Sequence, residues 1–274
     1  MPNPIGRCVP AELTTIEPTS LSLGHHHGCV LGKEGRPFCW NENGNGDGGP
    51  RRPVPAVADV AALSTGQAET CALLKDATVT CWSAAFAIAL TPPPLAPHQK
   101  GLANVTQLAM GELHGCALLT DKTVGCWGSS EDHPREPEQQ WLPWVVDGVA
   151  DASSIAVYES RACAVLHGGA VACWDIKSAT PHVATVVAGL PPVARIALGG
   201  RHACAMLQNQ QVTCWGANFD GQLADGTETD RASPQLTPDK RKFSWIAAAS
   251  NHTVMVADGG SLECWGAYDR VRYQ

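Results

Sequence analysis

The sequence has no long apolar run, no excess of positive charge and few aromatic residues other than tryptophan. No segment approaches the roughly 20 apolar residues that a membrane-spanning helix needs, so we expect no membrane span. The 19 Lys and Arg are outnumbered by 26 Asp and Glu, and the net charge of -7 argues against nucleic acid as a partner. The 27 Gly and 20 Pro, with little helical periodicity, indicate a protein of short β-strands.

Recognisable catalytic motifs are also missing. The chain contains no Gly-x-Ser-x-Gly nucleophile elbow, no His-Glu-x-x-His and no phosphate-binding loop. Because an active site can be assembled from loops far apart in sequence, an enzyme stays open as an alternative, with a non-enzymatic function favoured.

A pair of cysteines ten positions apart, the second followed by Trp, recurs along the chain. The five pairs are Cys29 and Cys39, Cys71 and Cys81, Cys116 and Cys126, Cys163 and Cys173, and Cys204 and Cys214. In a sixth copy Val254 takes the place of the first cysteine, ten residues before Cys264. We therefore expect one domain over residues 1–274, with repeats centred on 29–40, 71–82, 116–127, 163–174, 204–215 and 254–265.

Other positions repeat in step with the cysteines. Each unit has Leu or Ile eight positions before the first cysteine, and the next residue is always Ser or Ala. Five positions before the cysteine, four units have glycine, at Gly24, Gly66, Gly111 and Gly199. The small residues predict a strand lying close to another element, and the glycine predicts a turn between two strands. A strand, a turn and a hairpin therefore recur.

The hairpin can be built from residues 71–81 by folding them about Asp76 with a three-residue loop. Leu74 then faces Thr78, and Cys71 faces Cys81 at a Cα separation of roughly 4.5 to 5.5 Å, which a disulfide can bridge. Five disulfides within hairpins are predicted, each closing a loop that costs the unfolded chain about 2.5 to 3 kcal/mol of entropy. A zinc site, which needs four convergent ligands, is disfavoured by this spacing.

Disulfides persist in an oxidising compartment, which predicts a secreted, periplasmic or cell-surface protein. The beginning of the chain, Met1-Pro-Asn-Pro-Ile, has neither the basic start nor the apolar run of a signal peptide. We therefore interpret the sequence as a mature form with an added Met1.

Repeats of this length are typical of a β-propeller or a solenoid. The fifth unit, residues 199–223, resembles the repeat of the regulator of chromosome condensation family, with Asn218, Gly221, Gln222 and Leu223 all in place. The same skeleton extends over about residues 13 to 274. The resemblance implies an all-β β-propeller, and six units favour six blades over the seven of the best-known members. Exchange-factor activity on a nuclear GTPase, which the family name implies, is not carried over, because disulfides, acidity and six repeats depart from it.

Two cysteines remain once the five pairs are assigned, Cys8 and Cys264. We expect the N-terminal segment to supply the outer strand of the last blade, so that Cys8 pairs with Cys264 and closes the ring. The alternative is a pair of free thiols.

The repeated Trp and His residues are interpreted as parts of the scaffold. The Trp residues at 40, 82, 127, 174, 215 and 265 should pack between blades, since a ligand ring would hardly need one copy in each. The His residues at 27, 114, 202 and 252 should make structural hydrogen bonds. Two metal hypotheses are weaker alternatives: chelation by residues 25–27, and a calcium loop at residues 41–49, which lacks the terminal Glu. We expect no cofactor and no metal.

Function is sought where the units depart from their template. The third unit has an irregular loop, residues 129–144, that combines acidic residues with two Trp outside the repeat position. We predict that Trp141, Trp144, Glu136 and Glu138 contact a partner. An apolar loop at residues 83–95 and an acidic stretch at residues 220–230 are further candidates. The favoured function is an extracellular protein-binding propeller; a carbohydrate-binding propeller and an enzyme with a site in the channel are the alternatives.

Overall fold

A computed structural model describes residues 18–24, 27–41, 52–54, 57–67, 69–83, 102–128, 143–177 and 183–267. All regular elements in these ranges are β-strands. The chain forms two compact units, Met1–Pro97 and His98–Gln274. Within the described residues there is no helix of the length and hydropathy needed to cross a membrane.

The first unit contains two antiparallel sheets. One sheet is made of β1 (Pro18–Leu23), β2 (His27–Gly32), β3 (Pro37–Asn41) and β4 (Arg52–Pro53). The other is made of β5 (Val60–Thr65), β6 (Glu69–Leu74) and β7 (Val79–Ser83).

The second unit contains four sheets. The third sheet of the chain comprises β8 (Val105–Met110), β9 (His114–Leu119), β10 (Val124–Gly128) and β11 (Trp144–Val145). The fourth comprises β12 (Ala152–Tyr158), β13 (Arg161–Leu166), β14 (Val171–Asp175) and β15 (Thr185–Val186). The fifth comprises β16 (Val193–Leu198), β17 (His202–Leu207), β18 (Val212–Gly216) and β19 (Arg231–Leu236). The sixth comprises β20 (Phe243–Ala249), β21 (His252–Ala257) and β22 (Leu262–Gly266).

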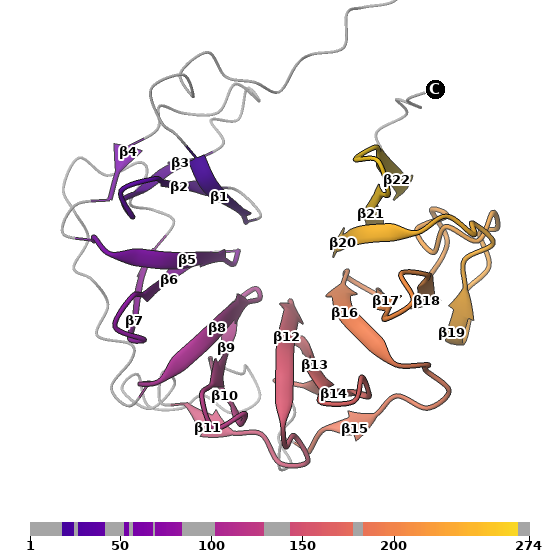
Figure 1. Cartoon of the computed structure of the whole chain (residues 1–274), viewed down its shortest axis with the longest axis horizontal. Helices are drawn as coiled ribbons and strands as arrows, with labels where there is room; N and C mark the ends of the chain where they lie inside the picture. Colours follow the sequence, from indigo (N-terminus) through magenta and orange to yellow (C-terminus); the bar gives the residue numbers. More distant parts are fainter. Residues whose placement is uncertain are drawn as a thin grey trace, which may run out of the picture. The chain divides into compact units, whose positions relative to one another are not determined.

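Each sheet is a meander in which consecutive strands are hydrogen-bonded neighbours. The six sheets correspond one to one with the six sequence units, and we number them as blades one to six. The fold is an all-β, six-bladed β-propeller, as predicted. In the second unit the first strands of the blades, β8, β12, β16 and β20, follow one another side by side (Figure 1).

The hairpin in each blade has the predicted register. Leu74 N–H donates to Thr78 O, and alternation along the ladder places Cys71 opposite Cys81 at a non-hydrogen-bonded pair, where strands approach most closely. The five predicted disulfides are present, with Cα separations of 4.0 to 4.1 Å. In the sixth blade Val254 lies opposite Cys264 in the same register. Cys8 lies outside the described residues, so its pairing with Cys264 stays a prediction.

The first strand of every blade contains a β-bulge that the sequence pattern did not reveal. The register shifts once in each of β1, β5, β8, β12, β16 and β20, and one residue is skipped. In four blades the skipped residue is Thr or Ser, and its hydroxyl donates to a carbonyl of the second strand; the four are Thr19, Thr106, Ser153 and Ser244. The bulge bends the strand without leaving this hydroxyl unsatisfied.

Four of the six repeated Trp residues pack on the preceding blade of their own unit. Trp82 lies in one apolar cluster with Cys29 and Cys39 of the first blade. Trp174, Trp215 and Trp265 likewise join clusters that contain disulfide cysteines of the third, fourth and fifth blades. For these four Trp residues the prediction of core packing is confirmed, and it explains the motif: the indole shares an apolar cluster with disulfide cysteines of the preceding blade.

Candidate functional site

The irregular loops share one end of the blades. In a four-stranded meander the turn between strands one and two lies at the same end as the connection between strands three and four. Backbone hydrogen bonds join the two: Ile176 N–H donates to Ser160 O, and Ala217 N–H donates to Arg201 O. We call this the loop end. In the second unit it is where residues 129–142 join β10 to β11 and residues 217–230 join β18 to β19.

Trp144, one of the predicted partner-binding residues, lies in the short outer strand β11. Its backbone pairs with that of Cys126 in β10, and its half-buried side chain packs against the cluster that fills the third and fourth blades. The next side chain, Val145, is 64% exposed. Trp144 therefore anchors the end of the irregular loop to the blade. The other three predicted residues, Trp141, Glu136 and Glu138, lie outside the described residues.

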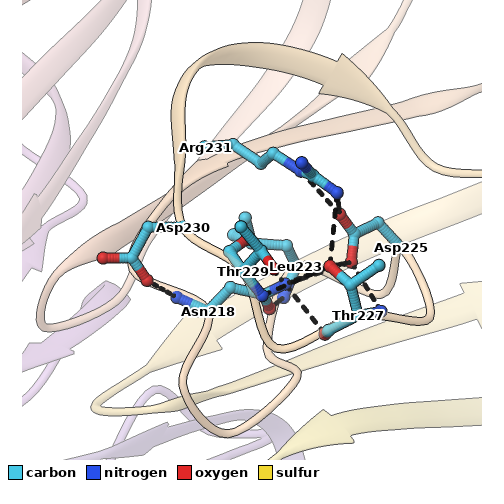
Figure 2. A network of polar contacts seen from close by, with 7 residues as sticks. All are labelled: Asn218, Leu223, Asp225, Thr227, Thr229, Asp230 and Arg231. Atoms are coloured by element: carbon cyan, nitrogen blue, oxygen red, sulfur yellow. Dashed lines mark hydrogen bonds and ion pairs between the residues drawn. The ribbon is translucent and has the colours of Figure 1, made fainter.

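The loop of the fifth blade is organised around the buried side chain of Asn218. Its Nδ2 reaches the carbonyl oxygens of Thr227 and Thr229 at 2.9 and 3.2 Å, and its Oδ1 accepts from the backbone N–H of Leu223 at 2.9 Å (Figure 2). One amide thus ties three distant points of the loop together. This is the asparagine on which the family resemblance rests, and its role is structural.

Two acidic residues of this loop, Asp225 and Asp230, accept hydrogen bonds from other residues of the same blade. Asp225 accepts hydrogen bonds from Thr227 and from Arg231, whose Nε lies 2.8 Å from the carboxylate (Figure 2). Burial by itself would raise the pKa of Asp225, but the hydrogen bonds from Thr227, Arg231 and Asn218 lower it to about 2. Asp230 accepts the backbone N–H of Asn218 at 2.8 Å. Glu228 and Asp230 remain exposed on this loop, and the large apolar side chain exposed beside them is that of Phe219, 48% exposed.

Two of the repeated histidines, His27 and His202, make the structural hydrogen bonds that were predicted for this position. His27 Nε2 lies 2.8 Å from Thr70 Oγ1 in the second blade, and His202 Nε2 lies 2.8 Å from Thr253 Oγ1 in the sixth. Thr253 in turn donates to the carbonyl oxygen of Gln222. Among the described residues no group of His, Cys, Asp and Glu is arranged to hold a metal ion. The weaker metal hypotheses concern residues 25–27 and 41–49, which are largely outside the described ranges.

Sequence reasoning overlooked a third Trp outside the repeat position. Trp245 lies in β20 and is 48% exposed, with the guanidinium of Arg195 in β16 stacked 3.7 Å from its ring centroid. The signal was present, because six of nine Trp occupy the repeat position and two more lie in the loop at 129–144. Its pairing with Arg195, 50 residues away, depends on how the two blades pack.

A family model for one repeat and several solved structures both match this chain. The regulator of chromosome condensation (RCC1) repeat matches residues 105–133, 193–222 and 211–256. No curated protein sequence matches significantly. Prp20p from Saccharomyces cerevisiae, described with its binding to Gsp1p and histones, is 16% identical over 95% of this chain and 73% of its own, with a TM-score of 0.70.

Two further solved structures have the same fold. Human WBSCR16 is 17% identical over 92% of this chain and 77% of its own, with a TM-score of 0.73. The CRINKLY ectodomain of the Arabidopsis thaliana receptor kinase ACR4 is 21% identical over 92% and 80%, with a TM-score of 0.61. The repeat matches fall on the third, fifth and sixth blades described above. The chain therefore contains RCC1-like repeats, in a propeller that has a hairpin disulfide in five of its six blades.

Proposed function

We propose that this protein is an extracellular or periplasmic binding protein that presents the loop end of its blades to a protein partner. The observation that carries the proposal is the contrast between scaffold and loops. Disulfides and interlocked Trp side chains fix the blades, while the connection 129–142 departs from the repeat in length and composition. Conformational restriction of a scaffold reduces the entropy that its loops lose on binding.

The half-buried Trp144 supports a role for the residues before it. An aromatic anchor at the end of a loop holds the chain that leaves the loop at a fixed point, next to exposed Val145. Trp141, three residues earlier, and the acidic pair Glu136 and Glu138 then supply the kinds of side chain that dominate partner recognition and orientation. The binding of Gsp1p and histones by Prp20p is a precedent for protein binding on this fold.

The disulfides support the proposed location. Five bridges in 274 residues are typical of proteins that fold outside the cytosol. Alkylation of free thiols in cells that make the protein natively, followed by mass spectrometry, should find the ten hairpin cysteines protected. Alkylation of most of them would contradict an oxidising compartment.

The partner proposal is tested with Trp141→Ala and with Glu136→Gln combined with Glu138→Gln. We expect affinity for a partner captured from the native extracellular milieu to fall about tenfold or more for Trp141→Ala, because interface Trp residues often dominate binding energy. The charge variant should mainly slow association. Leu236→Ala, at an exposed residue of β19, is the matched control.

Two results would contradict the proposal. Unchanged affinity in both loop variants would exclude this loop as the contact. A glycan-array signal that Trp141→Ala removes, without any protein partner, would support the carbohydrate-binding alternative instead.

A further inference from the structure

Arg195 and Trp245 occupy equivalent positions on the first strands of the fifth and sixth blades. Each is the first paired residue after its bulge: Arg195 faces Met206, and Trp245 faces Val256. Since β16 and β20 are neighbours in the same unit, the two side chains meet across the blade boundary. The guanidinium carbon lies 3.7 Å from the ring centroid, a cation–π contact.

The edge of the Arg195 guanidinium is unused within the described part of the chain. No acceptor among these residues lies within hydrogen-bond distance of its N–H groups, and burial lowers its pKa. Three other arginines differ from it: Arg161 donates to two carbonyl oxygens, Arg231 to Asp225, and Arg241 to Asp239 and Glu263. Arg195 therefore combines a fixed face with free donors.

At the same position in the third blade, the side chain of Gln107 uses both its donor and its acceptor in hydrogen bonds to the next blade. Gln107 donates from Nε2 to Ile155 O at 2.9 Å and accepts Ile155 N–H at Oε1 at 3.0 Å. This amide joins β8 to β12 and leaves little hydrogen-bonding capacity for a ligand. Arg195 makes the corresponding contact between blades by stacking its guanidinium on the ring of Trp245. Stacking covers the flat face of the guanidinium and leaves the N–H groups along its edge available to a ligand.

We propose that Arg195 and Trp245 form a binding site for a side-chain carboxylate of an acidic segment in a protein partner. A planar guanidinium presents parallel N–H donors that match the two oxygens of a carboxylate. The exposed indole edge of Trp245 can cover the methylene groups that carry that carboxylate. The exposed Lys242, which immediately precedes β20, adds a positive charge close in sequence to Trp245.

A carboxylate fits this site better than a phosphate group. Phosphate sites usually gather several backbone N–H groups at a helix end or an irregular loop. At Arg195 and Trp245 the backbone belongs to regular antiparallel ladders. The groups left to bind a ligand are the planar guanidinium of Arg195 and the ring of Trp245 beside it. Two parallel N–H groups of one guanidinium match the two oxygens of one carboxylate. This inference is independent of the loop at 129–142 and of the function proposed for it.

The site is tested by titrating the protein with the peptide acetyl-Gly-Glu-Gly-amide while recording the NMR signal of the Trp245 indole N–H, assigned by its loss in Trp245→Phe. We expect a saturable shift with the Glu peptide and none with its Gln counterpart. Arg195→Lys, which keeps the charge but loses the fork, should weaken binding about fivefold or more. Arg36→Lys, at an exposed arginine of the first unit, is the control.

The outcomes separate the possible ligands. Equal shifts with the Gln peptide would overturn the proposal, as would undiminished binding by Arg195→Lys. A stronger response to inorganic phosphate than to the Glu peptide would replace the carboxylate by a phosphoryl group and also overturn it. If Arg195→Lys fails to fold, as judged by near-ultraviolet circular dichroism, Arg195→Gln serves in its place, because glutamine occupies this position in the third blade.

Discussion

His202 is kept neutral where the fifth blade meets the sixth. Its ring is fully buried, and Gly199 leaves the space for it, because a side chain there would collide with the imidazole. Burial, with the positive charges of Arg161 and His252, lowers the pKa of His202 to about 4. In the unfolded chain its pKa is near 6.5, so the unfolded state binds the proton more readily below that pH.

We therefore expect the protein to lose stability as pH falls from 6.5 towards 4. His202→Gln, which keeps a hydrogen bond to Thr253 within reach, should reduce that loss by about 1 to 3 kcal/mol. Urea unfolding at pH 7 and at pH 4.5 measures the difference. His167→Gln, at an exposed histidine, is the control, and equal pH dependence in the two variants would contradict the assignment.

Titration of Glu69 changes the stability of the protein in the opposite direction: Glu69 contributes stability at low pH, whereas His202 reduces it there. It takes the repeat position of histidine at the start of β6, and burial raises its pKa to about 7. The folded state therefore binds the proton more readily than the unfolded chain between pH 4.5 and 7. The stability contributed by the protonated carboxyl is complete below pH 4.5 and is lost as pH rises through 7.

Glu69→Gln should consequently stabilise the protein at pH 8, by an amount on the order of 1 to 2 kcal/mol, and have little effect at pH 4.5. Chemical unfolding at the two pH values gives the comparison. A stabilisation that is the same at both would show that packing, and not ionisation, is responsible. Glu263→Gln, at a carboxylate paired with Arg241, provides a control with a different environment.

At the level of the hairpin, one position in each loop has a left-handed backbone. Ala77, Lys122 and Gln210 have φ values of 64°, 70° and 71° there, whereas Gly35 and Gly169 fill the same place in other blades. The N–H of each closes the turn onto the last residue of the preceding strand. A side chain costs energy in this conformation, and glycine does not.

Ala77→Gly should therefore stabilise the protein by about 0.5 to 1 kcal/mol, after allowing for the greater entropy of glycine in the unfolded chain. Thermal unfolding measures the change. The reciprocal variant Gly35→Ala should destabilise, since its φ is 74° and its added Cβ would lie 3.3 Å from the backbone of Val60. A loss of stability in Ala77→Gly would contradict the reasoning.

The elements show which features a sequence pattern can predict. Cysteines ten apart determine the hairpin register, because opposed residues in an antiparallel pair share a face. The bulges were not predicted, since skipping one residue leaves no mark on the spacing of the apolar positions. The acidic stretch at 220–230 stays a candidate for a binding surface, but its composition did not indicate that Asp225 and Asp230 also accept hydrogen bonds within their own loop. Such contacts depend on the folded path of the loop and not on its composition.

At the scale of the whole molecule, the disulfides form a series of repeated interlocks. A disulfide lies beneath the Trp of the following blade four times within the two units, at Trp82, Trp174, Trp215 and Trp265. In these four places one blade covers the bridge of its neighbour, and stability builds up from contacts between adjacent repeats. The candidate site of the loop at 129–142 was predictable as a departure from this series, whereas the site at Trp245 required the packing of two blades.

The sixth blade breaks the series, and its unpaired cysteine makes the last prediction. Cys264 is exposed, forms no disulfide with the described residues, and lies opposite Val254. We predict that Cys8 pairs with Cys264 and joins the two ends of the chain. Peptide mapping without reduction should recover that linkage beside the five hairpin pairs.

Val254→Cys supplies the matched test. It recreates the hairpin pair of the other blades, in the register at which their Cα atoms stand 4.0 to 4.1 Å apart. In this variant Cys264 has two possible partners, and a bridge to residue 254 would release Cys8 as a free thiol. If the wild type instead contains two alkylatable thiols, at Cys8 and Cys264, the N-terminal segment does not close the propeller covalently. A wild type that protects both, and a variant that exposes only Cys8, would show that the bridge missing from the last hairpin has been replaced by one that spans the chain.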